Sequence, residues 1–307
     1  LHIIGIEERK ENNKTVIVRK AVERRDEASL LENTINQLDA EDCLRHINGR
    51  LYGKDYEERL FNVAMELCIT WMNRILFLKL LEAQMLKYHN GDAIYKFLSI
   101  TKIHDYDDLN TLFFQVLARD MGSRTHSIMR DFAYVPYLNS SLFEVTDLES
   151  KTIKINSLSQ RTVLPVLASS VLRNKKRNLQ VNALPTLQYL FAFLDAYNFA
   201  SEGSEEVQEE AKTLINASVL GLIFEKINGH KDGSVFTPGF ITMFMCREAI
   251  TKTVLQKFNG YYGWNCTTRI ELYNHIDNIV EANELINSLR LCDPAVGSGH
   301  FLVSALN

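Results

Sequence analysis

One long run of helical periodicity, from Asp55 to His89, constrains the fold of this chain more than any other feature of the sequence. Apolar residues recur in it every three or four positions, at Leu60, Ala64, Leu67, Trp71, Ile75 and Leu78. This spacing places the apolar side chains on one face of an α-helix. At a rise of 1.5 Å per residue the helix would be about 50 Å long. We expect it to form the spine of a helical bundle, with Trp71 in the core.

Helical patterns dominate the rest of the chain as well. Asp105 is expected to cap a helix that runs through Ala118. The same periodicity predicts helices at residues 159–172, 185–199, 204–227, 238–258 and 270–289. Strands are expected only in four short stretches. His2–Ile6 and Thr15–Val18 would pair as a hairpin, and the other two are Thr152–Ile155 and the run Leu291-Cys292. The fold class is therefore mainly α.

Composition narrows the class of protein. The formal charge of −4 over 307 residues gives no overall attraction to nucleic acid, so any such contact must use local basic patches. The five cysteines are widely spaced and never form a C-x-x-C pair, which is typical of a reducing compartment such as the cytoplasm. No run of eighteen apolar residues and no leader pattern occurs. We expect a soluble cytoplasmic protein whose sequence is a piece of a longer one.

A glycine-rich turn near residue 297 carries the strongest functional signal. The segment 293–302 reads D-P-A-V-G-S-G-H-F-L, directly after Leu291-Cys292. Gly297 and Gly299 allow a tight turn between a strand and a helix, where the backbone comes close to a ligand. A dinucleotide fingerprint would place a third glycine where Leu302 stands, so a nicotinamide enzyme is disfavoured.

A second signal lies upstream of this turn. Residues 220–227 read L-G-L-I-F-E-K-I and lead into residues 233–238, which read G-S-V-F-T-P. Segment 293–302 resembles the cofactor-binding motif I of the gamma-type DNA adenine-N6 methyltransferases, and residues 220–238 resemble motif X of the same family. Val235 stands where that family more often has an aromatic residue. Segments 138–144 and 189–194 are similar to the helical region that precedes the methyltransferase in fused (type IIG/IIS) restriction-modification enzymes.

The resemblance implies a binding site for S-adenosylmethionine, whose groups include an ammonium, a carboxylate and a sulfonium. Asp293 is expected to bind the ammonium, and Thr237 to donate to the carboxylate. Phe301 and Phe236 are as well explained by ordinary core packing as by cofactor contact. The full set of expected cofactor-binding residues is Phe236, Thr237, Pro238, Asp293, Pro294, Ala295, Gly297 and Gly299.

The resemblance also implies a domain order. Residues 1–25 would be the edge of an upstream nuclease domain, residues 26–200 a helical connector, and residues 201–307 the truncated start of a Rossmann-like methyltransferase domain. The catalytic N/D-P-P-Y/F loop is expected downstream of Asn307, because no Pro-Pro pair occurs in this sequence. This chain alone is then expected to be inactive, and Mg²⁺ would be needed only by the nuclease.

Double-stranded DNA is the expected partner. The densest basic cluster is Arg173, Lys175, Lys176 and Arg177, and a looser one contains Arg119, Arg124, His126 and Arg130. Either cluster could contact phosphates, although a solvated loop is the more common role of such residues. The triplet Glu8-Arg9-Lys10 imitates the E-x-K of a nuclease core, but similar triplets recur elsewhere in the chain. No zinc-ligand spacing occurs, so no metal site is predicted.

Two other functions remain open at the level of sequence. The chain could be a helical scaffold or DNA-binding connector whose cofactor site does not work. Alternatively, it could start a methyltransferase that acts on RNA or on protein. The residues after Asn307 would distinguish among these functions.

Overall fold

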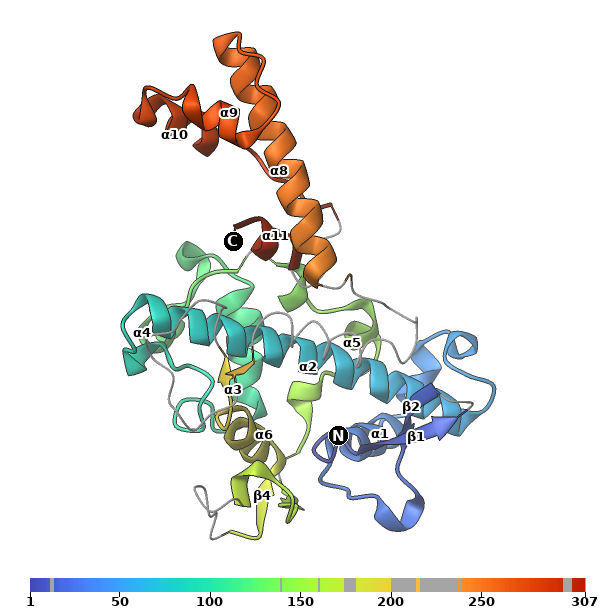
Figure 1. Ribbon diagram of the computed structural model, residues 1–307. Helices are drawn as coiled ribbons and strands as arrows, with labels where there is room; N and C mark the ends of the chain where they lie inside the picture. Colours follow the sequence, from blue (N-terminus) through green and yellow to red (C-terminus); the bar gives the residue numbers. More distant parts are fainter. Residues whose placement is uncertain are drawn as a thin grey trace. The chain divides into compact units, whose positions relative to one another are not determined.

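The chain forms two compact units, Leu1–Asn216 and Ala217–Asn307. A computed structural model describes residues 1–11, 14–138, 140–159, 161–173, 181–199, 214–215, 237, 239–294 and 300–306. These residues are mainly helical, with three small two-stranded sheets (Figure 1). The mainly α prediction is thus confirmed, although no Rossmann sheet occurs in the described ranges. No described helix has the length and apolarity that crossing a membrane requires.

The first unit opens with the predicted hairpin. Strand β1 (Ile6–Glu11) pairs antiparallel with β2 (Lys14–Arg19). The first strand begins later than predicted because Leu1–Gly5 forms a turn, closed by a 2.9 Å bond from the Gly5 amide to the Leu1 carbonyl. Gly5 has a φ of +98°, and a Cβ there would lie 2.5 Å from Ser29 Oγ. This turn therefore requires glycine.

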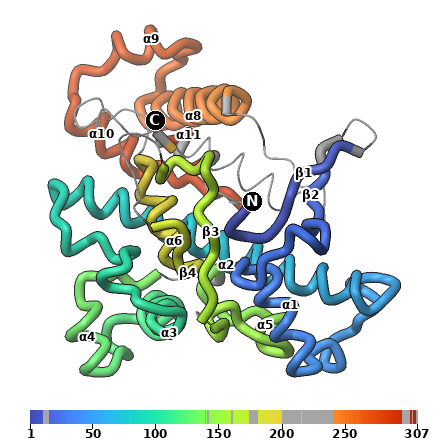
Figure 2. The backbone as a smooth tube through the Cα atoms, turned by 90° about the horizontal axis from the view of Figure 1, so that it is seen from below, coloured from blue at the N-terminus to red at the C-terminus, as the bar shows by residue number. Residues whose placement is uncertain are grey.

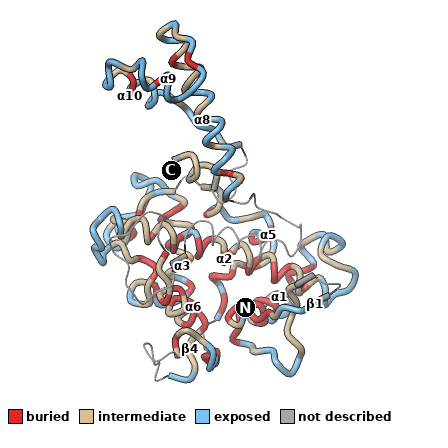
Figure 3. Tube along the Cα trace, in the orientation of Figure 1, coloured by how far each residue is buried: buried red, intermediate tan, exposed pale blue. Residues whose placement is uncertain are grey.

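Two helices build the core beside the hairpin. Helix α1 (Leu30–Ala40) packs on helix α2 (Tyr56–Tyr88). The length of α2 confirms the long helix predicted from Asp55 to His89. Asp55 caps α2 by accepting a 2.8 Å hydrogen bond from the Glu58 amide. The predicted apolar face of α2 is buried, and Figure 3 shows buried stretches along α1, α2, α3 and α6.

Short helices follow the long helix along the chain. Asp105 caps α3 (Tyr106–Thr111), as predicted, and the chain continues as a π-helix, Leu112–Leu117. Two more helices follow, α4 (His126–Phe132) and α5 (Asp147–Lys151). Single 3₁₀ turns connect these elements, at Val22–Arg24, Cys43–His46, Gly49–Leu51, Ala93–Tyr95, Met121–Ser123, Ser141–Phe143, Ile155–Ser157 and Val171–Arg173.

Several predicted elements are wrong in this unit. The described residues of the range 159–172 form no α-helix; they include β3 (Val163–Pro165), which pairs with β4 (Ala183–Pro185). The predicted strand at residues 152–155 is instead the loop after α5 and the first residue of the 3₁₀ turn Ile155–Ser157. Helix α6 spans Thr186–Leu194 and ends before β5 (Asn198–Phe199), which runs parallel to β6 (Leu214–Ile215). The predicted helix at 204–227 lies almost entirely outside the described residues.

A buried ion pair links α2 to α5. The Arg74 guanidinium donates to both carboxylate oxygens of Glu149, at 2.5 and 2.9 Å. It also donates to the carbonyls of Leu142 and Glu144, at 2.6 and 2.8 Å. Both charged side chains are almost completely buried, so their mutual pairing is what makes their burial tolerable.

The second unit contains helices α8 (Gly239–Tyr262), α9 (Arg269–Asn274), α10 (Ile279–Asn287) and α11 (His300–Leu306). The single helix predicted over residues 270–289 is wrong, because the chain breaks between α9 and α10. Leu291-Cys292 forms no strand either, since this unit offers no neighbouring strand among its described residues.

A small core forms where the C-terminal end of α8 meets α9 and α10. Its buried members are Phe258, Cys266, Leu272 and Ala282. The Asn259 side chain stabilises this core through two hydrogen bonds to the Cys266 backbone. Its amide nitrogen donates to the Cys266 carbonyl at 2.8 Å, and its amide oxygen accepts from the Cys266 N–H at 2.9 Å. We call residues 254–288 the tip of unit 2. Four of its apolar side chains are exposed by 70% or more, namely Ile270, Tyr273, Ile279 and Val280.

Candidate functional site

The two predicted motifs each lead into a helix of unit 2. Thr237 is exposed and stands just before α8, and Asp293 is half-buried in the approach to the glycine turn. Pro294 is exposed beside it. The remaining predicted cofactor residues, Phe236, Pro238, Ala295, Gly297 and Gly299, lie outside the described residues.

Helix α11, which follows the glycine turn, packs against α8, which follows Thr237 (Figures 1 and 2). Thr242 Oγ1 and Ser304 Oγ share a hydrogen bond of 3.1 Å. The Cys246 thiol donates to the Phe301 carbonyl, at a distance of 3.4 Å. Thr242 is fully buried at this contact. Segments about sixty residues apart in sequence therefore meet in one place.

The two contacts also fix the direction of α11. Residue numbers rise along α8 from Thr242 to Cys246 but fall along α11 from Ser304 to Phe301, so the helices run antiparallel. The start of α11 lies at the level of Cys246. Seven residues separate Gly239 from Cys246, or about 10 Å along the helix axis.

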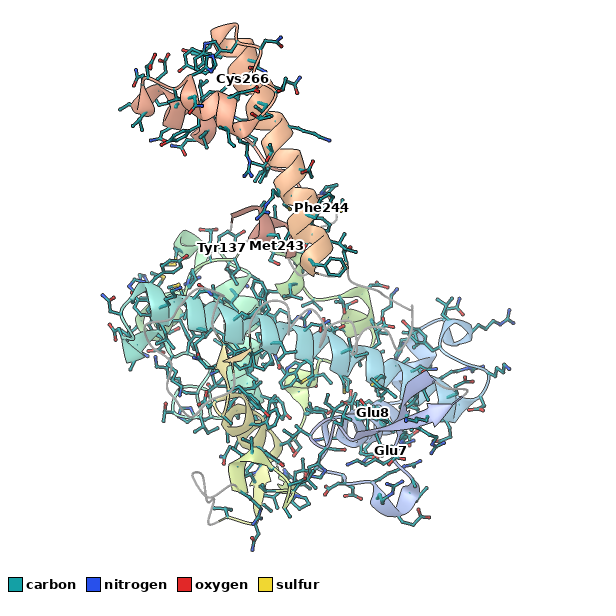
Figure 4. The ribbon with its side chains drawn as sticks, in the orientation of Figure 1. Glu7, Glu8, Tyr137, Met243, Phe244 and Cys266 are labelled. Carbon is teal, nitrogen blue, oxygen red and sulfur yellow. The ribbon has the colours of Figure 1, made fainter. Side chains whose placement is uncertain are left out.

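The apolar residues at the start of α8 do not all serve this contact. Phe240, Met243, Phe244 and Met245 are 77%, 44%, 65% and 50% exposed. Figure 4 shows Met243 and Phe244 on the first turns of the helix. The buried side of α8 is thus the side that carries Thr242, while much of its apolar surface faces solvent.

The first basic cluster is only partly described. Arg173 Nε donates to the Val166 carbonyl at 3.2 Å, and its Nη2 donates to Asn182 Oδ1 at 3.1 Å. These bonds tie together the two chain segments that flank the β3–β4 ribbon. Lys175, Lys176 and Arg177 lie outside the described residues, so a DNA contact by this cluster stays a prediction.

The second basic cluster is less suited to bind phosphate than its composition indicates. Arg124 is buried and donates to the carbonyls of Arg119, Phe132 and Val135. Burial lowers the pKa of Arg124. Arg130 is paired with Asp131 through two hydrogen bonds, at 2.8 and 3.2 Å. Two of the four basic side chains are therefore engaged within the protein.

The nuclease-like triplet lies on the hairpin. Glu8 and Lys10 fall on one face of β1, since residues two apart in a strand point the same way. Glu7, on the other face, pairs with Arg24 at 2.8 Å; Figure 4 marks Glu7 and Glu8. The described part of the chain holds no group of three His, Cys, Asp or Glu side chains that could bind a metal ion.

Sequence reasoning missed Thr242 and Cys246. Their spacing of four residues places them on one face of α8, and this was the available signal. The residues that they contact could not be identified from spacing, because Phe301 and Ser304 come from a helix more than fifty residues later in the chain.

Comparison with known proteins gives two matches. The chain is 29% identical over 270 residues to a protein of Methanocaldococcus jannaschii named "Putative type II restriction enzyme and methyltransferase RM.MjaORFECS2P". That alignment covers 76% of this chain but only 20% of the relative, so the chain spans about a fifth of that protein's length. No solved structure matches the chain.

The second match is to a protein family. The model for the family described as Domain of unknown function (DUF7814) matches residues 1–215. The match covers more than half of the chain and nearly all of its first unit. On this match, the chain is a member of the DUF7814 family.

Proposed function

We propose that this chain is part of a restriction-modification protein that transfers a methyl group from S-adenosylmethionine to adenine N6 in DNA. In this proposal residues 1–25 border a nuclease domain, residues 26–200 form a helical connector, and residues 201–307 begin the methyltransferase domain. The relative from Methanocaldococcus supports the restriction-modification context, because its name contains both activities.

One structural observation carries the proposal. The helix after the Thr237-Pro238 corner and the helix after the glycine turn pack on each other, with Thr242 bonded to Ser304. These are the helices that directly follow two independent motifs, each of which resembles part of the same cofactor site. If the resemblance were accidental, nothing would require these distant segments to meet.

The described residues fit the chemistry of the cofactor. Asp293 offers a half-buried carboxylate for an ammonium group, and Thr237 offers an exposed hydroxyl for a carboxylate. S-adenosylmethionine would supply the methyl group that is transferred. The residues of this chain would bind and orient its amino-acid end, while the adenine to be methylated would be held elsewhere in the parent protein.

Calorimetric titration of the chain with S-adenosylmethionine tests the proposal. We expect stoichiometric binding, and we expect Asp293→Ala to weaken it by about tenfold or more because a charge-assisted hydrogen bond is lost. The control is Asp277→Ala, which removes an exposed acid on the tip. No heat of binding with the unaltered chain would contradict the proposed site.

The same proposal predicts that the chain lacks methyltransferase activity. With tritiated S-adenosylmethionine and duplex DNA, we expect no label in the DNA, since no N/D-P-P-Y/F motif occurs in these residues. Incorporated label would show that the catalytic group lies within residues 1–307.

A second candidate function is a helical DNA-binding connector without cofactor. It is favoured by the family match, which ends at residue 215, before the first methyltransferase-like motif. This candidate predicts DNA binding without cofactor binding. Replacing Arg173, Lys175, Lys176 and Arg177 together should then reduce the salt dependence of DNA binding, measured as log K against log salt concentration.

A further inference from the structure

We propose that the tip of unit 2 is a dimer interface, at which a second copy of this chain binds. Such a dimer needs neither the cofactor nor DNA methylation, so the proposal goes beyond the proposed function and does not depend on it. Three features of the tip support it, namely its exposed apolar side chains, its prearranged backbone and its pattern of charge.

The exposed apolar side chains of the tip come from one short stretch of the chain. Ile270 and Tyr273 are one turn apart on α9, so they lie on the same face of that helix. Ile279 and Val280 begin α10, five residues after α9 ends. Each of the four is exposed by 70% or more. Large apolar side chains gathered at the surface in this way are typical of a protein-binding site.

The backbone that carries these side chains is fixed within the tip itself. Thr268 caps α9 in a capping box with Glu271, and Asn278 caps α10. Both helices contribute to the tip core. The rings of Tyr262 and Trp264 pack against that core and stack on each other, with centroids 4.2 Å apart. Because little ordering is needed on binding, more of the contact energy remains for association.

The charge of the tip favours a protein partner over DNA. Residues 254–288 contain two basic and four acidic side chains, which gives a net charge of −2. A DNA-binding surface needs clustered lysine and arginine residues to neutralise phosphates. The tip would repel the DNA backbone instead.

Each tip also carries both members of a complementary charge pair. Arg269 is exposed at the first residue of α9, and Glu284 is exposed in the last turn of α10. Neither side chain forms an ion pair with another residue in the described part of the chain. In a two-fold dimer the same surface of both copies meets, so α9 of one copy can lie against α10 of the other. Arg269 then faces the partner's Glu284, and the pair forms twice. A second copy thus matches the tip in both apolar surface and charge.

Sedimentation velocity of the unaltered chain, at about 1 to 200 μM protein, tests the dimer. An interface of a few side chains predicts a dissociation constant on the order of 10 μM. We expect monomer to convert to dimer and to nothing larger, because a two-fold contact closes on itself. A monomer at every concentration would leave the surface to a different protein and overturn the inference. Species that keep growing with concentration would overturn it as well, since they would mark unspecific adhesion.

Single substitutions locate the interface. Tyr273→Lys and Ile279→Lys each place a charge in the contact and should weaken the dimer by about tenfold or more. Leu51→Lys is the matched control, because Leu51 is 72% exposed but lies in unit 1, and its dimer should be unchanged. At concentrations where the unaltered chain is a monomer, all three variants should melt at its temperature. A dimer that survives both tip substitutions would contradict the proposed location.

Charge reversal tests the two-fold pairing. Arg269→Glu and Glu284→Arg should each weaken the dimer by about three- to tenfold, and the chain with both changes should recover most of the affinity. Neither change should harm its helix, because an acid at the start of α9 and a base in the last turn of α10 suit the helix dipoles. Absence of recovery in the double variant would overturn the pairing.

The same sedimentation runs with a duplex oligonucleotide test the other class of occupant. We expect DNA to leave the equilibrium between monomer and dimer unchanged. DNA that dissociates the dimer would show that the tip binds DNA instead, and the inference would be wrong. S-adenosylmethionine enters none of these measurements, so their outcome is independent of the calorimetric test of the proposed function.

Discussion

At the scale of single residues, Arg74 shows how an apolar helix can contain a charge. Arg74 lies on α2, between the apolar residues Trp71 and Leu78 in the sequence. Its charged side chain is almost fully buried, as theirs are. Four hydrogen bonds to Glu149 and two backbone carbonyls satisfy its guanidinium. The phenyl rings of Phe113 and Phe114 lie 5.9 and 5.3 Å from it. The charge is thus enclosed by both polar and aromatic partners.

Removing one member of this pair should be costly. Arg74→Met leaves Glu149 buried without its partner, and we expect the free energy of unfolding to fall by about 3–5 kcal/mol. Urea denaturation measures this loss. Lys151→Gln is the control, since Lys151 pairs with Asp147 at the surface and should cost under about 1 kcal/mol. Equal losses in the two variants would contradict the account.

Acid should weaken the same pair. Burial raises the pKa of Glu149, but hydrogen bonds from Arg74 and the Thr146 amide outweigh burial, and the net pKa lies below its ordinary value. A group of this kind stabilises the fold above its unfolded-state pKa, about 4.3, and the stabilisation is lost as pH falls through the folded-state pKa. Denaturation between about pH 5 and 3 should therefore show a steeper loss of stability for the unaltered chain than for Glu149→Gln.

Sequence reasoning could find the face of α2 but not the partner of Arg74. The apolar period depends only on neighbours along the chain, whereas Glu149 is seventy-five residues away. The same limit applies to the candidate site. Its glycine turn and Thr237 were recognisable as local motifs, but the register between Thr242 and Ser304 depends on how two distant helices pack.

At the scale of elements, α9 and α10 show why periodicity alone overestimates helix length. Residues 270–289 keep an apolar period, but Asn278 caps α10 by accepting a 3.3 Å bond from the Glu281 amide. A residue in an N-cap has extended backbone angles, so the helix before it must end. The period continues across the break because both helices pack on the same tip core.

The tip should unfold before the rest of the chain, because its core has few buried residues. Asn259→Ala removes both bonds to the Cys266 backbone and leaves that amide and carbonyl unpaired. We expect the tip to lose about 2–3 kcal/mol of local stability and its amides at residues 266–286 to exchange faster. Amides of α2 serve as the internal reference and should keep their protection.

At the scale of the whole molecule, the first unit has a core of its own. The buried face of α2 contacts α1 and the segments before β3, all within Leu1–Asn216. Bonds across long sequence separations close this unit, such as that from His2 to the Pro165 carbonyl at 2.8 Å. The first unit thus has the buried core and the long-range contacts that a separately folding unit needs.

Residues 1–216 should accordingly fold alone. Calorimetry of this segment should give one cooperative transition, with a midpoint within a few degrees of the matching transition in the full chain. A segment that unfolds without cooperativity, or that melts far lower, would show that unit 1 depends on residues 217–307.

The exposed apolar side chains of the tip affect how the purified protein behaves in solution. Ile270, Tyr273, Ile279 and Val280 are 76%, 77%, 70% and 70% exposed on two short neighbouring helices. Purified material should accordingly scatter more light as it is concentrated, and should bind hydrophobic dyes while still folded. Introducing lysine at Ile270 and Val280 should raise the solubility limit without lowering the melting temperature, which would make the protein far easier to crystallise or to handle on a column.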